Sequence, residues 1–375
     1  MKARREPPPL PDAAAPPAPR ANPDLIGHEA AETTLRQLFE SGRMPHALLL
    51  SGPRGIGKAT LAFRLARFVL ATGAQATLPR GFLAEAGDED LAIPPEGGVF
   101  RRIASGGHAD LLTVERAYDP RRRRLRNDIV VDNTREISTF LRLTPAEGGW
   151  RVVIVDGADD MNRNAANALL KILEEPPRRT LLLLVAHSPG RLLPTIRSRC
   201  RRFPLAPLTP AMVRQLLARY RPDLPTGQAE TLIALSGGSI GRALELAGAG
   251  GVELYETVLA LVSSEKGNDA AALHGFADRL ARGEAEDSYR AVEELLGRLL
   301  VRLAIGNAGR EADAELSAPA AETALLHRFA GRAPAARWAE LHDEIGQSFA
   351  RTDALNLDRK QTILGAFFAI EAAAR

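Results

Sequence analysis

The sequence predicts an α/β domain built on a parallel sheet, followed by a small helical lid and an all-α C-terminal domain. Three observations lead to this fold class. A glycine-rich phosphate-binding pattern at 52–58 stands between a short apolar run and a helical stretch. Strand and helix patterns then alternate as far as residue 206, which is typical of a parallel sheet covered by helices. Beyond the prolines at 207 and 210, the chain has the apolar spacing of helices joined by short loops.

Domain boundaries follow changes in composition along the chain. The first 22 residues are rich in Pro and Ala, and we expect them to form a disordered tail because they hold too few apolar side chains to pack a core. We expect four parts: the tail at 1–22, a phosphate-loop (P-loop) nucleotide-type domain at 23–206, a helical lid at 207–252, and a helical oligomerisation domain at 253–375.

Within the α/β domain, apolar periodicity predicts the individual elements. Helices are expected within 24–41, 58–71 and 162–177, and around 137–141. Buried strands are expected within 47–52, 111–114, 151–155 and 180–188. Residues 73–107 are rich in Gly, Pro and Ala, and we expect a surface excursion there. Residues 192–205 are expected to connect the last strand to the lid.

The composition excludes several classes of protein. The 375 residues are 45% apolar and 25% charged, as in ordinary soluble proteins, and the formal net charge of +3 is not that of a polycation. The single cysteine, Cys200, excludes an internal disulfide and a multi-cysteine zinc site. No apolar run is long enough for a transmembrane helix, and the N-terminus lacks the apolar core of a signal peptide. We expect a cytoplasmic protein without zinc, another bound metal of its own or a membrane partner.

The first candidate site is the phosphate loop in SGPRGIGKATL. In such a loop, backbone N–H groups at a helix N-terminus bind phosphate oxygens, and the lysine reaches the β- and γ-phosphates. The next residue normally supplies a hydroxyl to Mg²⁺, but here it is Ala59, and a threonine follows one place later. The alternative is a glycine-rich turn without a ligand. If ATP or ADP binds, with Mg²⁺ accompanying it, we expect these residues to hold it: Gly52, Gly55, Gly57, Lys58 and Thr60.

The second candidate site is the acid that ends the strand VVIVD. The position of Asp156 at the end of a strand predicts that it faces the Mg²⁺ of a bound nucleotide. The alternative is an acid that ends the strand and has no role at a metal ion. Active ATPases of the oligomeric class usually follow this aspartate with a glutamate that orients the attacking water, but here Gly157 follows. Asp159 or Asp160 could substitute, although each is displaced along the turn. Losing one electrostatic contact commonly costs about 3 kcal/mol of barrier, so two losses at one site predict deficient hydrolysis.

The third candidate site is TIRSRC, residues 195–200, and here the sequence resembles the bacterial clamp-loader family of AAA+ proteins. Ser198-Arg199-Cys200 matches the family's Ser-Arg-Cys motif. The resemblance implies that Arg199 is an arginine finger, which reaches the ATP of a neighbouring subunit and stabilises charge on the transferred phosphoryl group. The alternative is that Arg199 belongs to a basic surface patch with Arg197, Arg201 and Arg202.

Further segments carry the same resemblance, from residue 24 to the C-terminus. They are LIGHEAAETTL, MPHALLLSGPRGIGKATLA, NALLKILEEPP, SGGSIGRALEL and LNLDRKQTIL. A broken nucleotide site with an intact finger is similar to the delta-prime type of subunit rather than to the gamma/tau motor. The resemblance implies a hetero-pentamer with gamma/tau and delta subunits, joined by C-terminal collars, that loads a sliding clamp onto primed DNA during replication by DNA polymerase III.

The sequence departs from the family pattern at three places. The family's four-cysteine zinc module is absent. At the end of the last predicted strand Ala186, His187 and Ser188 compete as the polar residue that senses the γ-phosphate. In the lid, Gly241 occupies the place expected for the nucleotide-contacting arginine, with Arg242 beside it.

Three other interpretations stay open. An active gamma/tau-like ATPase is disfavoured by Ala59 and Gly157, and a stand-alone P-loop phosphotransferase is disfavoured by the Ser-Arg-Cys motif and the long helical half. The arginine cluster at 121–126 is either a DNA-binding element or a solvated loop.

Overall fold

The computed structural model describes residues 16–74, 90–119, 124–126, 128–147, 149–263, 270–310 and 319–374. The chain divides into two compact units, Met1–Met212 and Val213–Arg375. This division lies six residues beyond the predicted boundary at 206. The second unit includes both the predicted lid and the predicted oligomerisation domain, so their separation from one another stays a prediction.

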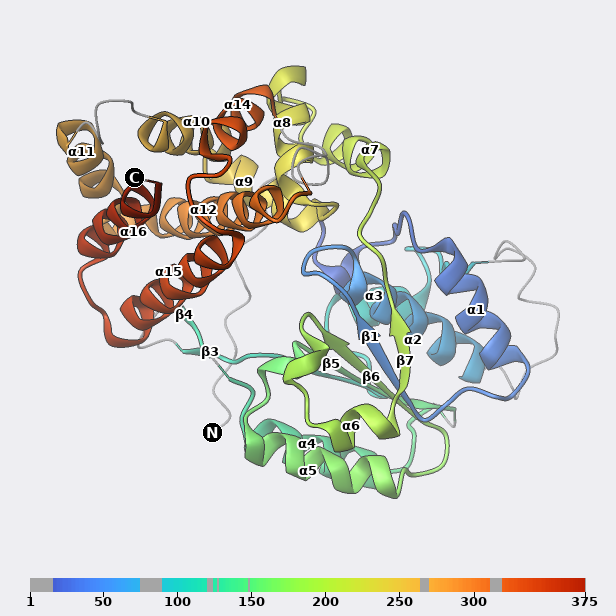
Figure 1. Cartoon of the computed structure of the whole chain (residues 1–375). Helices are drawn as coiled ribbons and strands as arrows, with labels where there is room; N and C mark the ends of the chain where they lie inside the picture. Colours follow the sequence, from blue (N-terminus) through green and yellow to red (C-terminus); the bar gives the residue numbers. More distant parts are fainter. Residues whose placement is uncertain are drawn as a thin grey trace. The chain divides into compact units, whose positions relative to one another are not determined.

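The N-terminal unit is built on a five-stranded sheet whose neighbouring strands are all parallel (Figure 1). The strand order is β2-β5-β6-β1-β7. The bounds are β1 Ala47–Ser51, β2 Leu111–Val114, β5 Arg151–Asp156, β6 Thr180–Ala186 and β7 Arg201–Pro204. The first four strands in chain order confirm the predictions. The sequence did not reveal β7, because its four residues include two exposed arginines and no apolar alternation.

Helices cover both faces of this sheet (Figure 1). The first face packs on α1 (Glu29–Glu40), α2 (Lys58–Ala74) and α3 (Gly98–Ala104). The second face packs on α4 (Val131–Arg142), α5 (Arg163–Glu174) and α6 (Pro194–Arg199). Successive strand residues alternate between the two cores, as the period of two in a strand requires. The predicted P-loop α/β fold class is therefore confirmed.

Two of these helices correct the sequence-based predictions. α3 lies inside the segment 73–107 that was expected to be a surface excursion, and it buries Phe100 and Ile103. α6 lies inside the expected connection at 192–205, and Ile196 anchors it in the second core. Each has seven or fewer residues, so neither is long enough to produce a clear helical period.

Several short elements complete this unit. Two two-residue strands, β3 and β4, form an antiparallel pair. Their bounds and those of the 3₁₀ turns are β3 Tyr118–Asp119, β4 Arg124–Leu125, η1 Pro19–Ala21, η4 Ala158–Asp160 and η5 Pro189–Arg191. In the arginine cluster, 121–123 lie outside the described residues.

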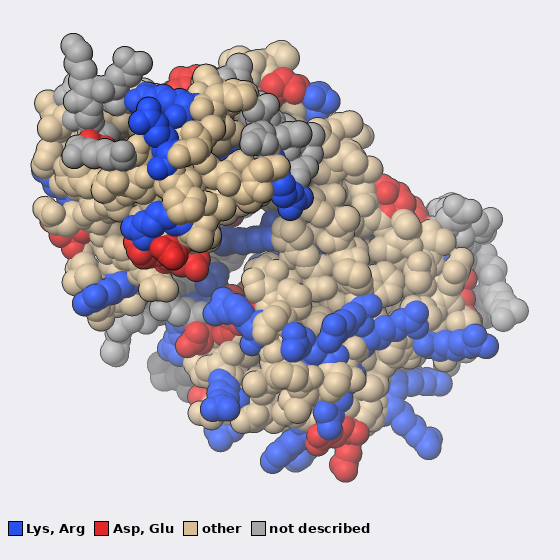
Figure 2. All heavy atoms as spheres, viewed as in Figure 1, with Lys and Arg blue, Asp and Glu red and all other residues tan. Residues whose placement is uncertain are grey.

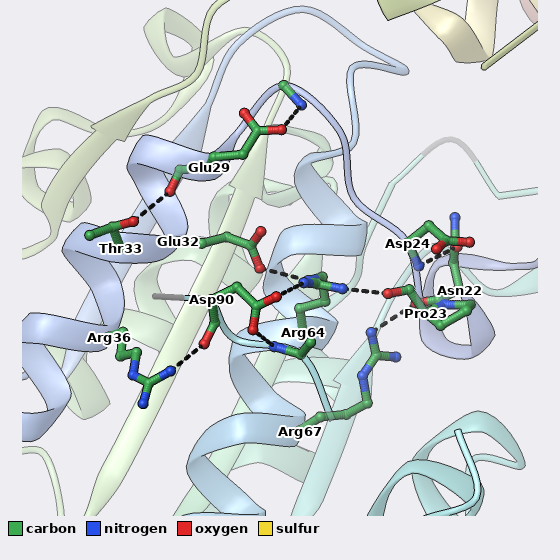
Figure 3. Close-up of polar contacts among 12 residues, drawn as sticks. Asn22, Pro23, Asp24, Glu29, Glu32, Thr33, Arg36, Arg64, Arg67 and Asp90 are labelled. Atoms are coloured by element: carbon green, nitrogen blue, oxygen red, sulfur yellow. Dashed lines mark hydrogen bonds and ion pairs between the residues drawn. The ribbon is translucent and has the colours of Figure 1, made fainter. Parts of the chain in front are cut away.

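α2 is buried along most of its length, and two of its buried residues are arginines. Arg64 donates from Nε to Oε1 of Glu32 on α1 at 2.6 Å, and it also donates to the carbonyl of Pro23 (Figure 3). Arg67 donates to the carbonyls of Asn22 at 2.8 Å and of Arg20 at 3.1 Å. Burial lowers the pKa of Arg67 to about 10.

These contacts fix the chain that precedes α1. Backbone carbonyls of the segment 20–23 are the acceptors for both guanidinium groups, so the segment lies against α2. Its 3₁₀ turn η1 also lies within the stretch that was expected to belong to the disordered tail. The physical reason is that two buried cations on α2 need acceptors, and local backbone supplies them.

Every regular element that the structure describes in the C-terminal unit is a helix, as predicted (Figure 1). α7 crosses the boundary between the units. The bounds are α7 Pro210–Tyr220, α8 Thr226–Ser236, α9 Ile240–Gly248, α10 Gly251–Val262, α11 Ala270–Leu280, η6 Gly283–Ala285, α12 Glu286–Asn307, α14 Ala320–Phe329, α15 Ala335–Leu355 and α16 Arg359–Ala374. α12 packs along α15, where the rings of Tyr289 and Phe349 lie 5.0 Å apart. None of the helices in the described parts of the chain is both long and apolar enough to cross a bilayer.

Replacing Glu32 by Ala is expected to lower the free energy of unfolding by about 3 kcal/mol, because it removes the carboxylate from a buried arginine. Both side chains are less than 10% exposed. The matched control is Glu40→Ala, since Glu40 pairs with Arg36 at the surface, where such a pair contributes less than about 1 kcal/mol. Urea unfolding of both variants measures the difference. Equal losses would contradict a structural role for the buried pair.

Candidate functional site

The phosphate loop has the backbone that its glycines predict. It runs between β1 and α2, and Gly52, Gly55 and Gly57 have φ values of 149°, 76° and 102°. A Cβ atom on Gly52 would overlap the carbonyl oxygen of Leu205, and one on Gly57 would lie 3.2 Å from Cδ1 of Leu25. Backbone conformation and close packing therefore both require glycine here.

Lys58 opens α2 and is 3% exposed. Its Nζ donates to the carbonyl of Pro53 within the same loop. Burial lowers the pKa of Lys58 to about 8, against the opposing attraction of Asp156 and Asp159. Thr60 is also buried, on the first turn of α2. The loop thus presents a buried cation and a helix N-terminus, which together suit a phosphate group, whereas the two nearby acids alone would repel one.

Asp156 lies at the carboxyl end of β5, where the sequence predicts it. Burial raises the pKa of this carboxyl and Glu115 raises it further, while the Lys58 ammonium lowers it. The structure therefore brings together Lys58 and Asp156, which are almost 100 positions apart in the chain. A bound Mg²⁺ could take one carboxylate from Asp156, but Ala59 offers it no oxygen in place of the usual hydroxyl.

The two acids that follow Gly157 already have partners in the turn. Both oxygens of Asp159 accept from the backbone N–H of His187 at 3.1 Å, and its Oδ2 also accepts from that of Ser188 at 2.7 Å. Asp160 Oδ2 lies 3.4 Å from Nε of Arg116. Both carboxylates therefore hold the turn in place, and the suggested substitution for the missing glutamate stays a prediction.

The geometry distinguishes Ala186, which ends β6, from His187 and Ser188, which follow it. Ala186 is buried in the core and has no polar side chain, and Ser188 is exposed. Burial lowers the pKa of His187, and the nearby cations Lys58 and Arg54 lower it too. Its Nδ1 is buried without a hydrogen-bond partner in the described protein. Of these three residues, His187 is therefore the one whose side chain interacts electrostatically with the loop lysine.

Arg54 was not singled out from the sequence. Its charge lowers the pKa of both Lys58 and His187, so its guanidinium belongs to the same cluster. The signal available in the sequence was its position in the middle of the glycine loop, a place that the phosphate-binding pattern leaves unspecified.

Arg199 is the last residue of α6, and its side chain is 37% exposed. Its Nη2 lies 2.9 Å from Oε1 of Glu174, and its Nη1 donates to the carbonyl of Thr195 at 3.1 Å. The adjoining Cys200 is buried, which raises the pKa of its thiol to about 12. Arg199 is thus presented at the surface from a fixed backbone.

Basic side chains gather on the face of the N-terminal unit that Figure 2 shows. Arg201 and Arg202, next to Arg199 in the chain, are both exposed. The basic-patch interpretation of this segment therefore stays open beside the finger interpretation. In the C-terminal unit, Arg242 pairs with Glu294 of α12 at 2.5 Å, and burial lowers the pKa of Arg242. Within the described ranges, no group of three or more His, Cys, Asp or Glu side chains is arranged to hold a metal ion.

The fold and the site together define a P-loop α/β protein with a helical C-terminal part. Residues 27–209, within the N-terminal unit, match the family model described as DNA polymerase III, delta subunit. This stretch contains all the predicted site residues, from Gly52 to Arg199. The resemblance to delta-prime-type clamp-loader subunits, which the motifs predicted, is therefore confirmed.

Two curated proteins and one solved structure illustrate what this chain is similar to. The DNA polymerase III subunit delta' of Pseudomonas aeruginosa is 42% identical over 217 residues, which are 57% of this chain and 59% of that protein. The gamma/tau subunit of Mycobacterium bovis is 28% identical over 280 residues, which are 73% of this chain and 45% of that protein. The chain thus spans about half the length of these relatives. A solved DNA polymerase III gamma subunit-related protein from Thermotoga maritima aligns with 91% of this chain and 99% of its own, at 20% identity and a TM-score of 0.38.

Lys58→Met is expected to raise the free energy of unfolding at pH 7. The lysine is protonated in both states below pH 8, and only the folded state carries the cost of burying the charge. The interval between about 8 and the ordinary value of 10.5 corresponds to roughly 3 kcal/mol. Between these values the unfolded chain binds more protons, so wild-type stability rises with pH and the advantage of the variant shrinks.

Urea unfolding at pH 7, 8 and 9.5 measures this effect. The matched control for the loss of one positive charge is Lys171→Met, at an exposed lysine of α5. A Lys58→Met advantage that stays constant or grows with pH would contradict the depressed pKa.

Gly157→Ala is expected to lower the free energy of unfolding by about 1–2 kcal/mol, because a φ of 77° is unfavourable for a residue with a side chain. A Cβ atom would also lie 3.0 Å from Oδ2 of Asp160. The matched control is Gly190→Ala, where φ is not positive and nothing lies within 4 Å. That variant should be neutral or slightly stabilising in the same urea titration. A neutral Gly157→Ala would contradict the steric requirement.

Proposed function

We propose that this chain is a delta-prime-like subunit of the DNA polymerase III clamp loader. In this proposal it takes part in ATP-dependent loading of a sliding clamp onto primed DNA. Its own nucleotide site is deficient in hydrolysis, and it supplies Arg199 to the ATP of a neighbouring subunit. The resemblance over residues 27–209 supports the class of protein, and the side chains of the site support the division of roles.

The observation that carries the proposal is the set of contacts at the end of β5. Gly157 has no side chain that could orient water. Asp159 is bonded to the backbone after β6, and Asp160 lies against Arg116. Together with Ala59, this leaves a loop that has a phosphate-binding backbone, no hydroxyl directly after Lys58 and turn acids that are already engaged in structural contacts. Binding of ATP or ADP remains compatible with the loop, and Mg²⁺ would enter only with the nucleotide, facing Asp156.

Arg199 supports the second half of the proposal. An arginine finger must be exposed, fixed at its backbone and directed away from its own nucleotide site. Arg199 meets the first two conditions. Its guanidinium is exposed, and the helix that it ends is fixed in the core by the buried Ile196. Planar guanidinium groups bind phosphate oxygens through several N–H donors at once.

The proposed partners follow from the resemblance. They are gamma/tau and delta subunits in a hetero-pentamer, a sliding clamp and primed DNA. The basic face in Figure 2 is electrostatically suited to DNA phosphates, which bind lysine and arginine without regard to sequence. An active gamma/tau-like motor is the competing assignment, because a gamma/tau subunit is also similar over 73% of this chain.

Arg199→Ala is expected to slow clamp-dependent ATP turnover in a loader reconstituted from the full chain, motor and delta subunits, clamp and primed DNA. At the site that receives the finger, the loss should be on the order of 10³-fold, the lower end for such arginines. Lys58→Ala should change total turnover by less than about twofold, since this chain's own site contributes little.

The same assay with this chain alone distinguishes the rival assignments. No turnover alone, with stimulation in the mixture that Arg199→Ala abolishes, supports the proposal. Robust turnover by the isolated chain, abolished by Lys58→Ala, would identify a motor subunit or a separate P-loop enzyme. Normal turnover by the mixture containing Arg199→Ala would eliminate the finger assignment.

A further inference from the structure

We propose that Glu174 is a positioning residue that holds the Arg199 guanidinium in the orientation in which it meets a neighbour's nucleotide. The inference rests on the proposed finger role of Arg199. It assigns a function to the end of the NALLKILEEPP segment, which the P-loop, the strand-ending acid and the Ser-Arg-Cys motif leave unexplained.

Two contacts from different elements define the orientation of Arg199. The carboxylate of Glu174, at the end of α5, lies 2.9 Å from Nη2. The carbonyl of Thr195, one turn back in α6, accepts from Nη1 at 3.1 Å. Because the guanidinium is planar, two contacts at different nitrogens fix its plane as well as its position. Five N–H donors are available in this group, so these contacts do not exhaust them.

The two helices that carry the pair are themselves fixed. Leu169, Ile172 and Leu173 of α5 lie in the same buried core as Ile196 and Cys200, which flank the finger. The α5 helix ends directly after Glu174, and the prolines at 176 and 177 prevent its continuation. The distance between the Glu174 and Arg199 backbones is therefore set by the core, and the side chains need only select one pair of rotamers.

Glu174 and Arg199 are both too exposed for their ion pair to contribute much to the stability of the fold. Glu174 is 50% exposed and Arg199 is 37% exposed. An exposed ion pair typically shifts a folding equilibrium by no more than about fivefold. A free arginine on the surface samples many rotamers, and only some of them point at a given phosphate. A contact that selects the correct rotamer can therefore change turnover by up to the same factor, and the remaining donors stay available for the phosphate.

Steady-state ATP turnover of the full reconstituted loader tests this role. Glu174→Ala is expected to lower kcat roughly three- to fivefold with little change in KM, since an orientation that matters only in the transition state appears in kcat. Glu174→Gln retains an acceptor oxygen for Nη2 and should stay within about twofold of wild type. The matched control, Glu175→Ala, removes the same charge from the adjacent exposed position and should leave kcat unchanged.

A double variant separates positioning from a general effect. Combined with Arg199→Ala, Glu174→Ala should have no additional effect, because its only proposed action is through the arginine. The isolated Glu174→Ala chain should unfold at the same urea concentration as wild type.

The kcat values of these variants distinguish the positioning role of Glu174 from the finger role of Arg199. A normal kcat for Glu174→Ala, when Arg199→Ala is slow, would overturn the positioning role and leave the finger assignment intact. Additive losses in the double variant, an equal loss in Glu175→Ala, or a Glu174→Gln variant as slow as Glu174→Ala would overturn it as well. A normal kcat for Arg199→Ala would overturn the proposed function itself.

Discussion

The burial of α2 against the parallel sheet is the constraint on which the rest of the N-terminal unit depends. The helix begins at Lys58, so its position also sets the position of the phosphate loop. Because it is buried along most of its length, its two central arginines must find acceptors inside the protein. Arg64 donates a hydrogen bond to Glu32 of α1, and both arginines donate to backbone carbonyls of the segment before α1. The burial of α2 thus fixes the positions of the phosphate loop, of α1 and of the segment that precedes α1.

The sequence predicted those parts of the fold whose signals are local and strong. Four strands consist almost entirely of apolar residues, and the glycine loop between a strand and a helix has a defined spacing. The elements it missed are short and depend on tertiary contacts. β7 is a strand because Leu48 to Ser51 pair with it, although its own residues include exposed arginines. α3 is a helix held by Phe100 and Ile103 in a stretch whose composition resembles a loop.

For the site, the sequence predicted which residues would lie there but not which groups their side chains would contact. Lys58 and Asp156 lie near one another, because β1 and β5 are parallel strands of one sheet, separated only by β6, and their carboxyl ends lie at the same edge. The contacts of Asp159 with the backbone at 187 and 188 could not be predicted, because they depend on how the turn after β5 meets the end of β6. The approach of Glu174 to Arg199 likewise depends on the packing of α5 on α6.

The turn at Gly157 also limits which residues can follow Asp156. A mutation to glutamate would place a side chain on a backbone with φ of 77°, close to the carboxylate of Asp160. Such a variant would therefore be less stable unless the turn and the contacts of Asp159 changed with it. The conformation that suits glycine at 157 therefore also disfavours a longer side chain in the position next to Asp156.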